Sequence, residues 1–299
     1  MMELTVLSGK GGTGKTSISA ALASISKSAV LCDNDVDAAD LHLILHPTIK
    51  EEHSFSSGWK ASIDTSKCKN CGLCISLCRF DAIHTDKNEG LTINPFQCEG
   101  CRLCERICPE QAIHSDLNTN NYWYVSSTRF GSLIHAKMGP GEENSGKLVT
   151  QVRKKAKAIA QAEGAEWIIN DGPPGIGCAA IASLTGTDRA LIVIEPSMSS
   201  LHDADRLIKL IKSFNIPCFA LINKYDLNLD LSQRIEDFLN CQNIPLLTKL
   251  PFDKDMVQAM IKGKTIVEYA AESKLSKELK SLWHKIQVSK QKVDLHQAI

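Results

Sequence analysis

The sequence predicts an α/β protein with a mostly parallel sheet and helices on both faces, interrupted by a small α+β insertion. Apolar strand patterns alternate with helical patterns along the 299 residues. The first strand pattern runs into a glycine-rich loop that precedes a helical pattern. Two four-cysteine runs separate the second strand pattern from the third. Strands are expected near residues 4–8, 29–32, 122–126, 167–170, 190–194, 217–222 and 246–250.

Because the cysteine runs lie between two strand patterns, the α/β domain is predicted to be discontinuous. We place it at residues 1–57 and 118–299, and the inserted domain at 58–117. A chain of this length can bury a full core and still carry a second module. A short helical pattern from Ala39 to Leu45 precedes the insertion.

Charge and cysteine usage narrow the classes of function. Lys and Arg total 34 and Asp and Glu total 34, so no net charge attracts nucleic acid or an anionic membrane. Twelve cysteines occur without a secretory pattern or a long apolar run, which favours a reducing compartment where thiols bind metal. We therefore expect a cytoplasmic protein without a nucleic-acid partner.

The first glycine-rich segment satisfies the phosphate-binding pattern G-x4-G-K-[ST] in a strand, loop and helix context. Glycines let backbone N–H groups surround phosphate oxygens, and the helix presents its positive amino-terminal end. Lys15 is predicted to bind the β- and γ-phosphates, and the Thr16 hydroxyl to bind Mg²⁺. The predicted nucleotide-binding residues here are Gly9, Lys10, Gly11, Gly12, Thr13, Gly14, Lys15, Thr16 and Ser17.

Acidic residues follow two further strand patterns at their carboxyl ends, where ligands bind in open α/β sheets. Asp33 and Asp35 are candidates for orienting the attacking water, and Asp37 for the magnesium shell. Capping of the next helix is the alternative for each of these three. Asp171 precedes a glycine-rich turn and is predicted to hold the magnesium shell, directly or through water. Cys178, seven residues later, is interpreted as a small buried hydrophobe.

A third polar segment follows the strand pattern at 217–222. Asn223-Lys224-Tyr225-Asp226 spells the N-K-x-D motif, which by itself predicts guanine recognition. Pro251-Phe252-Asp253 follows the last strand pattern and is a second candidate wall of a base pocket.

The two cysteine runs share the spacing C-x2-C-x2-C-x3-C at an offset of thirty residues, from Cys68 to Cys98. Residues 82–86 and 112–116 repeat at the same offset, so the unit is duplicated internally. Such spacing binds cubane iron-sulfur clusters, and the last cysteine of each run crosses to the other cluster. A disulfide framework or zinc knuckles are the alternatives, and they fit this spacing poorly. The predicted ligand sets are Cys68, Cys71, Cys74 and Cys108 for one cluster, and Cys98, Cys101, Cys104 and Cys78 for the other.

Together these motifs resemble a known superfamily over residues 2 to about 269. The segment K-G-G-T-G-K-T from Lys10 is similar to the deviant, SIMIBI-type Walker A loop of MinD, ParA, Mrp and the nitrogenase iron protein. Asp171-Gly172-Pro173-Pro174-Gly175 resembles the D-x-P-P-G stretch of Mrp-like ATPases. Residues 67–116 resemble a bacterial-type ferredoxin, although Arg79 rather than proline follows Cys78. The chain thus resembles a MinD-superfamily P-loop ATPase with an inserted two-cluster ferredoxin domain.

The resemblance implies ATP, Mg²⁺ and two 4Fe-4S clusters as cofactors. It also implies a homodimer, with dimerisation constitutive or ATP-dependent, in which Lys10 reaches the nucleotide of the partner subunit. The implied catalytic residues are Lys10, Lys15, Asp33 and Asp35. Relatives with this loop use ATP and place an asparagine on adenine, so Asn223, Lys224, Pro251 and Asp253 become candidates for the adenine pocket, and GTP is the alternative.

Three functions are weighed on this basis. The leading hypothesis is an ATPase whose nucleotide state is coupled to electron transfer through the clusters to a redox partner. The alternatives are an Mrp-type carrier that delivers clusters to an acceptor protein, and a MinD-like positioning switch with structural or sensing clusters. Eight cysteines that enclose two complete sites favour electron transfer over delivery.

An amphipathic helical pattern follows near residue 275. Packing of this helix against its own domain is favoured, and membrane contact through it, as in MinD, is the alternative. The apolar face comprises Leu275, Leu279, Leu282, Trp283 and Ile286.

Overall fold

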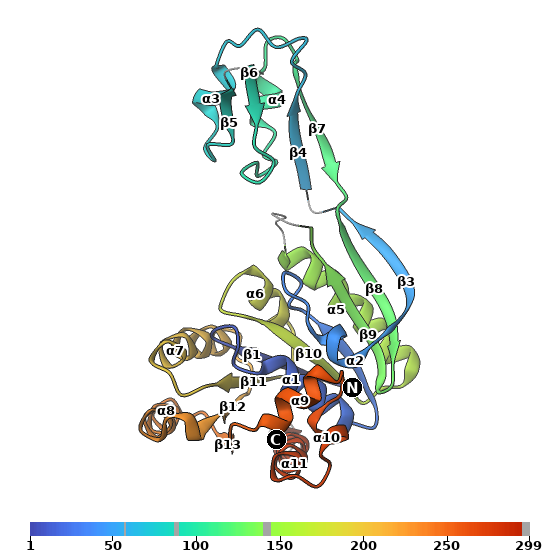
Figure 1. The fold of residues 1–299 in the computed structure, drawn as a ribbon, viewed down its shortest axis with the longest axis vertical. Coiled ribbons are helices and arrows are strands. Elements are labelled where there is room, and N and C mark those ends of the chain that lie inside the picture. The colour runs from blue at the N-terminus through green and yellow to red at the C-terminus, as the bar shows by residue number, and fades with distance from the viewer. Residues whose placement is uncertain (57, 87–89, 140–144, 295–299) are drawn as a thin grey trace. The chain divides into compact units, whose positions relative to one another are not determined.

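The computed structural model describes residues 1–56, 58–86, 90–139 and 145–294, and the chain divides into two compact units (Figure 1). The first unit combines Met1–Glu52, Trp123–Lys137 and Gly146–Ile299. The second combines His53–Tyr122 and Met138–Ser145. Each unit is described by itself below.

The first unit is built on a nine-stranded sheet in the order β13-β12-β11-β1-β10-β2-β9-β8-β3. From β13 to β9, every neighbouring pair is parallel. Strands β8 and β9 are joined by two residues, a connection that permits only antiparallel pairing. The bounds are β1 Met2–Ser8, β2 Ala29–Asp33, β3 Thr48–Phe55, β8 Asn121–Thr128, β9 Gly131–Lys137, β10 Trp167–Pro174, β11 Arg189–Ile194, β12 Cys218–Asn223 and β13 Leu246–Leu250.

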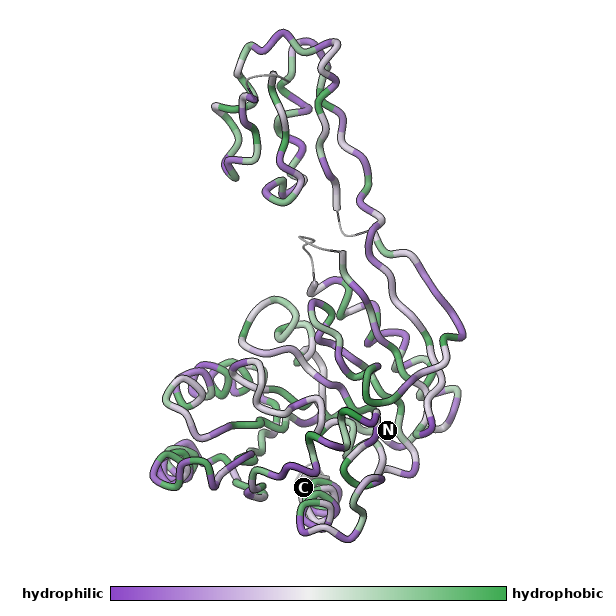
Figure 2. The backbone as a smooth tube through the Cα atoms, viewed as in Figure 1, coloured by the Kyte–Doolittle hydropathy of each residue, from purple (hydrophilic) through white to green (hydrophobic). Residues whose placement is uncertain are grey.

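Helices cover both faces of this sheet, because alternate residues of its strands point to opposite sides. Leu4 and Val6 of β1 join one apolar cluster, whereas Leu7 joins the other. In Figure 2, α7 and α8 mix hydrophobic and hydrophilic residues along their turns, as expected of helices with one buried face. The helices are α1 Lys15–Ile25, α2 Leu41–Leu45, α5 Ser145–Glu163, α6 Cys178–Leu184, α7 Met198–Ser213, α8 Leu229–Cys241, α9 Lys254–Ile261, α10 Ile266–Tyr269 and α11 Lys274–Asp294, with a 3-10 turn η1 at Tyr225–Leu227.

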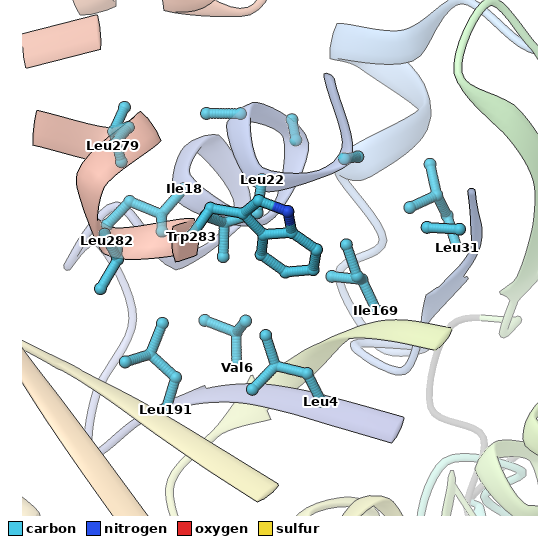
Figure 3. Packing of buried hydrophobic residues seen from close by; sticks show 14 of the residues in the cluster. Leu4, Val6, Ile18, Leu22, Leu31, Ile169, Leu191, Leu279, Leu282 and Trp283 are labelled. Atoms are coloured by element: carbon cyan, nitrogen blue, oxygen red, sulfur yellow. The ribbon is translucent and has the colours of Figure 1, made fainter. Parts of the chain in front are cut away.

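The carboxyl-terminal helix α11 packs its apolar face on the sheet and on α1. Leu279, Leu282 and Trp283 lie beside Ile18 and Leu22 in Figure 3. Each of the five side chains of the predicted apolar face is buried. Burying one such side chain contributes about 1.5–3 kcal/mol. The expectation that this helix packs against its own domain is confirmed, and none of the described helices is both long and apolar enough to cross a membrane.

One arginine fixes the segment that follows the first aspartates. Arg129, between β8 and β9, donates to the carbonyl oxygens of Ile44 and Leu45 at the end of α2, at 3.0 and 2.7 Å. Its guanidinium also pairs with Glu268 of α10 at 2.6 Å. The last carbonyl groups of a helix have no hydrogen-bond partner within the helix, and here the Arg129 guanidinium supplies one. The position of α2 is therefore fixed by Arg129, which lies more than eighty residues further along the chain.

The second unit contains the same supersecondary motif twice, and its two outer strands pair with each other, as do its two inner strands. The outer strand β4 (Gly58–Ile63) pairs antiparallel with β7 (Ile113–Asn118), and the inner strand β5 (Ile83–Asp86) with β6 (Gly90–Ile93). Ile63 is opposite Ile113, and Ile83 is opposite Ile93. Ile63 and Ile93 are equivalent in the thirty-residue repeat, and so are Ile83 and Ile113, so each pair joins a strand from one repeat to a strand of the other kind. The helices α3 Leu73–Leu77 and α4 Leu103–Ile107 also correspond. Positive φ angles recur at equivalent positions, in Asn70 and Gly100, Gly72 and Arg102, and Asp81 and Gln111.

The predicted α/β class with a mostly parallel sheet is confirmed, and the seven expected strands are present. Of the nine strands of this sheet, β3 and β9 were not predicted. The side chains of β3 are mostly exposed, because it lies at the sheet edge, so it carries no apolar pattern. The helix expected from Ala39 begins at Leu41.

Candidate functional site

The glycine-rich loop connects β1 to α1 at the carboxyl edge of the parallel strands. Gly12 and Gly14 have φ angles of +80° and +90°, which favour glycine. A Cβ at Gly14 would lie 2.5 Å from Nδ2 of Asn223. The Ser8 hydroxyl donates to the Lys10 carbonyl oxygen at 2.7 Å. The loop is therefore shaped by its own sequence and by the end of β12.

Strand pairing brings two predicted acids together. Val6 of β1 pairs with Asp171 of β10, and Asp171 pairs with Asp33 of β2. Lys15 at the start of α1 is 6% exposed, and its Nζ lies 3.5 Å from carboxylate oxygens of both Asp35 and Asp171. Burial opposes its charge, but Asp171, Asp35 and Asp33 together raise the pKa of Lys15. The predicted catalytic lysine thus lies among three predicted acids.

The crowding of carboxylates changes their acidity. Burial, together with the charge of Asp171, raises the pKa of Asp33 well above its ordinary range. Burial raises the pKa of Asp35 to about 6, against the attraction of Lys15. Burial also raises the pKa of Asp37. Asp33 additionally accepts the backbone N–H groups of Asp35 and Leu41, both at 3.1 Å, so it also caps α2. Sites that concentrate buried acids in this way suit a bound cation.

The residues fit a magnesium–phosphate group by an independent observation. Asp171 Oδ2 and Thr13 Oγ1 are buried and have no hydrogen-bond partner among the described residues. Asp171 Oδ1 accepts the Ser19 hydroxyl at 2.9 Å, which orients the carboxylate. In the described part of the chain, no three His, Cys, Asp or Glu side chains converge as a complete site for one metal ion. Mg²⁺ is commonly held by one or two carboxylates with phosphate and water, so a partial protein shell is expected.

Lys10 lies in an ion-pair bridge that the sequence did not reveal. Its Nζ is 2.6 Å from Oε1 of Glu195, and Lys224 Nζ is 3.3 Å from Oε2 of the same carboxylate. Lys10 also donates to the Ser199 hydroxyl at 3.3 Å. Glu195 follows β11 directly, so the signal that identified Asp33 and Asp171 applies to it as well.

The predicted base-recognition residues hold the phosphate loop and each other. Asn223 Nδ2 donates to the Thr13 carbonyl oxygen at 2.8 Å, and Lys224 Nζ donates to the Gly12 carbonyl oxygen at 3.0 Å. Asp226 accepts the Phe252 backbone N–H at 2.7 Å, which joins η1 to the segment after β13. Next to Phe252, Pro251 is half-buried, and Asp253 caps α9 by accepting the Asp255 N–H at 2.8 Å. The motif therefore supports the loop through both of its first two residues.

In the second unit, four predicted ligands line one cavity, although no three cysteines in the described ranges converge as a complete site for one metal ion. The walls include the thiols of Cys68, Cys71, Cys74 and Cys108, which the sequence assigned to one cluster. The other lining residues are mainly apolar, and they include Lys69 and Glu110, which form an ion pair at 2.8 Å. The cavity residues are Ile63, Cys68, Lys69, Cys71, Leu73, Cys74, Leu91, Cys108, Pro109, Glu110 and Ile113.

Backbone amides point at the sulfurs of this unit in a repeated manner. The N–H of Ala82 donates to Cys78 Sγ at 3.4 Å, and that of Ala112 donates to Cys108 Sγ at 3.3 Å. Burial, together with the nearby Cys98, Cys101 and Cys74, raises the pKa of the Cys104 thiol to about 11.

One interpretation from the sequence is wrong. Cys178 is exposed rather than buried, because it is the first residue of α6, where the chain leaves the turn after β10. Cys32 has the role expected of a small buried hydrophobe, with no exposed area in β2.

The sheet order, the glycine loop and the buried lysine with its acids define a P-loop nucleotide-binding protein. The family described as the CobQ/CobB/MinD/ParA nucleotide binding domain matches residues 4–266, so the chain belongs to this family. Residues 4–266 therefore form a MinD/ParA-like nucleotide-binding domain. The predicted relation to MinD and ParA is confirmed, and the ferredoxin resemblance stays a prediction.

Relatives and solved structures agree with this family. The chain is 35% identical to the uncharacterized protein MJ0578 of Methanocaldococcus jannaschii, over 96% of each chain. It is 30% identical to the septum site-determining protein MinD of Synechocystis, over 46% of this chain and 52% of that protein. The fold resembles Pyrococcus furiosus cell division ATPase MinD with a TM-score of 0.58, at 20% identity and with 96% and 98% of the chains covered. It also resembles Pyrococcus horikoshii MinD complexed with Mg-ADP, with a TM-score of 0.57, at 18% identity and with 95% of each chain covered.

Proposed function

We propose that this chain is an ATP-hydrolysing iron-sulfur protein in which the nucleotide state of a homodimer controls electron transfer through two 4Fe-4S clusters to a partner protein. One observation carries the proposal: four cysteines of a duplicated motif line a single cavity, in a chain whose other unit has a MinD/ParA-like nucleotide site. The domain division at 1–57 and 118–299 with 58–117 inserted is part of this proposal.

The nucleotide site is proposed to bind ATP with Mg²⁺. Thr16 and Asp171 would hold the metal, with Asp37 acting through water, and Lys15 would bind the phosphates. The orphaned oxygens of Asp171 and Thr13 support this assignment. A magnesium ion complexed with ADP in the Pyrococcus horikoshii relative supports it further. Mg²⁺ would supply charge neutralisation to the phosphates, and Asp33 and Asp35 would orient the attacking water.

Adenine rather than guanine is the proposed base. Both side-chain polar atoms of Asn223 are used at the loop and its own turn, since Oδ1 accepts the Lys224 N–H at 3.1 Å. Asp226, the guanine-reading position of the N-K-x-D motif, already accepts the Phe252 N–H. These contacts make the motif a support of the phosphate loop, and the choice of adenine rests on the resemblance of the loop to that of ATP-using relatives.

The second unit is proposed to hold two 4Fe-4S clusters. The cavity thiols would bind one, and Cys98, Cys101, Cys104 and Cys78 the other. Such clusters supply one-electron transfer at a potential set by hydrogen bonds, charge and exposure. The N–H donors at Cys78 and Cys108 would stabilise the reduced, more negative state of each site. Apolar walls from Ile63, Leu91 and Ile113 would limit the access of water to the first site.

Coupling between the two units can be tested on protein purified and kept without oxygen. We expect the rate or the midpoint potential of cluster reduction to change when ATP is added, and not when ATP is added to the Lys15→Ala variant. The measurement is absorbance and electron paramagnetic resonance during a redox titration. Incubation with an apo-acceptor protein is the second arm. Clusters that transfer readily to the acceptor would favour the carrier function, and clusters indifferent to ATP would leave only a positioning switch.

Lys10→Ala tests the proposed role of the first loop lysine. Lys10 lies outside the cluster of Lys15 and its acids, so the variant should retain ATP affinity within about twofold. Its ATP turnover should fall by about a hundredfold or more, because the lysine is proposed to stabilise the transition state across the dimer. The measurements are equilibrium binding of a fluorescent ATP analogue and phosphate release. Full turnover in this variant would remove the trans-acting role of Lys10.

A further inference from the structure

Glu195 stands at the middle of three neighbouring strand ends. It follows β11, which lies between β1 and β12 in the sheet. The phosphate loop follows β1, Asn223 is the last residue of β12, and Lys224 comes directly after it. Because parallel strands present their carboxyl ends at one edge, an acid after β11 is placed to contact residues after both neighbours.

The contacts form what we term the lysine bridge: Lys10, Glu195 and Lys224. Each carboxylate oxygen of Glu195 contacts a different lysine, at 2.6 Å for Lys10 and 3.3 Å for Lys224. Lys224 also donates to the Gly12 carbonyl oxygen at 3.0 Å, so it is anchored to the loop independently of Glu195. Burial opposes ionisation of Glu195, but hydrogen bonds from both lysines lower its pKa, and it is charged at neutral pH.

In the lysine bridge, Lys10 forms its ion pair with a carboxylate of its own subunit. An ammonium held at 2.6 Å by a carboxylate of its own subunit has one N–H donor and part of its charge engaged there, so contact with the nucleotide of a second subunit competes with this ion pair. The side chains of Lys10 and Glu195 are 30% and 20% exposed, so solvent weakens their attraction. When Lys10 leaves, Lys224 stays beside Glu195 and still compensates its charge. The arrangement therefore holds Lys10 without making its release prohibitive.

From these contacts we infer that Glu195 is a positioning residue that holds Lys10 in its own subunit, and that breaking this ion pair is a required step before Lys10 acts on the partner's nucleotide. The inference rests on the proposed ATP-dependent homodimer. Among the described residues, the Glu195 carboxylate forms its ion pairs with Lys10 and Lys224 and not with Lys15, so we place its effect on the site through Lys10.

The test is Glu195→Gln in the full-length protein, a change that keeps shape and removes charge. Freed from its carboxylate, Lys10 should reach the partner more readily. Dimer formation with ATP should then occur at about fivefold lower protein concentration, a change typical of an exposed ion pair. Half-maximal turnover should occur at correspondingly lower protein concentration, while the maximal turnover is unchanged. Analytical ultracentrifugation and phosphate release across a protein dilution series measure both quantities.

A double variant and a matched control make the result specific. In the Lys10→Ala background, Glu195→Gln should have no further effect on dimer formation, because the restrained group is absent. Glu236→Gln is the control, since Glu236 forms an ion pair of similar length with Lys249 at 2.7 Å and similar exposure, away from the loop. It should leave dimer formation unchanged. Thermal unfolding checks that all variants are folded.

Two results would overturn the inference. Either Glu195→Gln leaves dimer formation equal to wild type or weakens it, or it has the same effect with and without Lys10. Both are separate from failure of the proposed function, which would appear as absence of ATP binding or of an ATP-induced dimer in the wild-type protein.

Discussion

Lys15→Ala is expected to abolish ATP binding, with affinity reduced by at least about a hundredfold. Lys15 is the buried cation of the loop, 6% exposed, and the predicted partner of the phosphates. Removing one partner from a buried charge pair costs about 3–5 kcal/mol, which corresponds to that factor or more. Equilibrium binding of a fluorescent ATP analogue measures the loss, with Lys10→Ala as the matched lysine variant that should still bind.

The same variant should change the pH dependence of unfolding without nucleotide. The folded-state pKa of Asp35 is about 6, above its ordinary value of 3.8, so the folded protein binds a proton more tightly than the unfolded chain. Stability from this group therefore rises as pH falls through about 6 toward 4. Without the attraction of Lys15, the pKa of Asp35 should rise further and this gain should begin at higher pH. Urea unfolding at pH 8 and pH 6 measures the shift.

Two outcomes would contradict this account of Lys15. Wild-type affinity for ATP in Lys15→Ala would show that the loop does not bind phosphate through this lysine. An unchanged difference in stability between pH 8 and pH 6 would show that Lys15 and Asp35 are not electrostatically linked, despite their 3.5 Å separation.

Pairs of cysteine substitutions should remove either one or both clusters, depending on the pair. The anaerobically reconstituted wild-type protein should contain about eight iron atoms per chain, and Cys74→Ala about four. Adding Cys108→Ala should leave about four, because Cys74 and Cys108 line the same cavity. Adding Cys78→Ala instead should leave almost none, since Cys78 is assigned to the other site. Iron analysis and the visible absorbance of the clusters measure these outcomes.

This design separates the crossed assignment from a sequential one. If each run held its own cluster, Cys74→Ala with Cys78→Ala would lose only one cluster, and Cys74→Ala with Cys108→Ala would lose both. Cys178→Ala is the control, because this exposed cysteine lies outside the repeat and should leave the iron content unchanged. A colourless wild-type protein after reconstitution would remove the clusters from the proposed function.

Most strands and helices of the fold could be predicted from local sequence patterns. Buried central strands such as β11 and β12 show continuous apolar runs, so their positions could be read directly. The edge strand β3 could not, because its side chains face solvent and its pairing is decided by the neighbour β8. Helix α11 was recognisable because its apolar residues recur at helical spacing, and the same residues pack on the sheet.

Part of the candidate site was readable for the same reason. The phosphate loop, Asp33 and Asp171 are each recognised from a short segment that follows an apolar strand. The exposure of Cys178 was misjudged, since a residue type gives only an average burial and its place at the start of α6 decided the outcome.

The sequence by itself determined the segments that carry chemistry: the glycine loop, the acids after the strands and the duplicated cysteine spacing. Only the tertiary structure decided which of them meet. Strand order places β10 between β1 and β2, so Asp171 reaches both Lys15 and Asp33, and it places β11 between β1 and β12, so Glu195 holds Lys10 and Lys224. The physical reason is that pairing between strands far apart in the chain is cooperative across the whole sheet, and no local pattern records it.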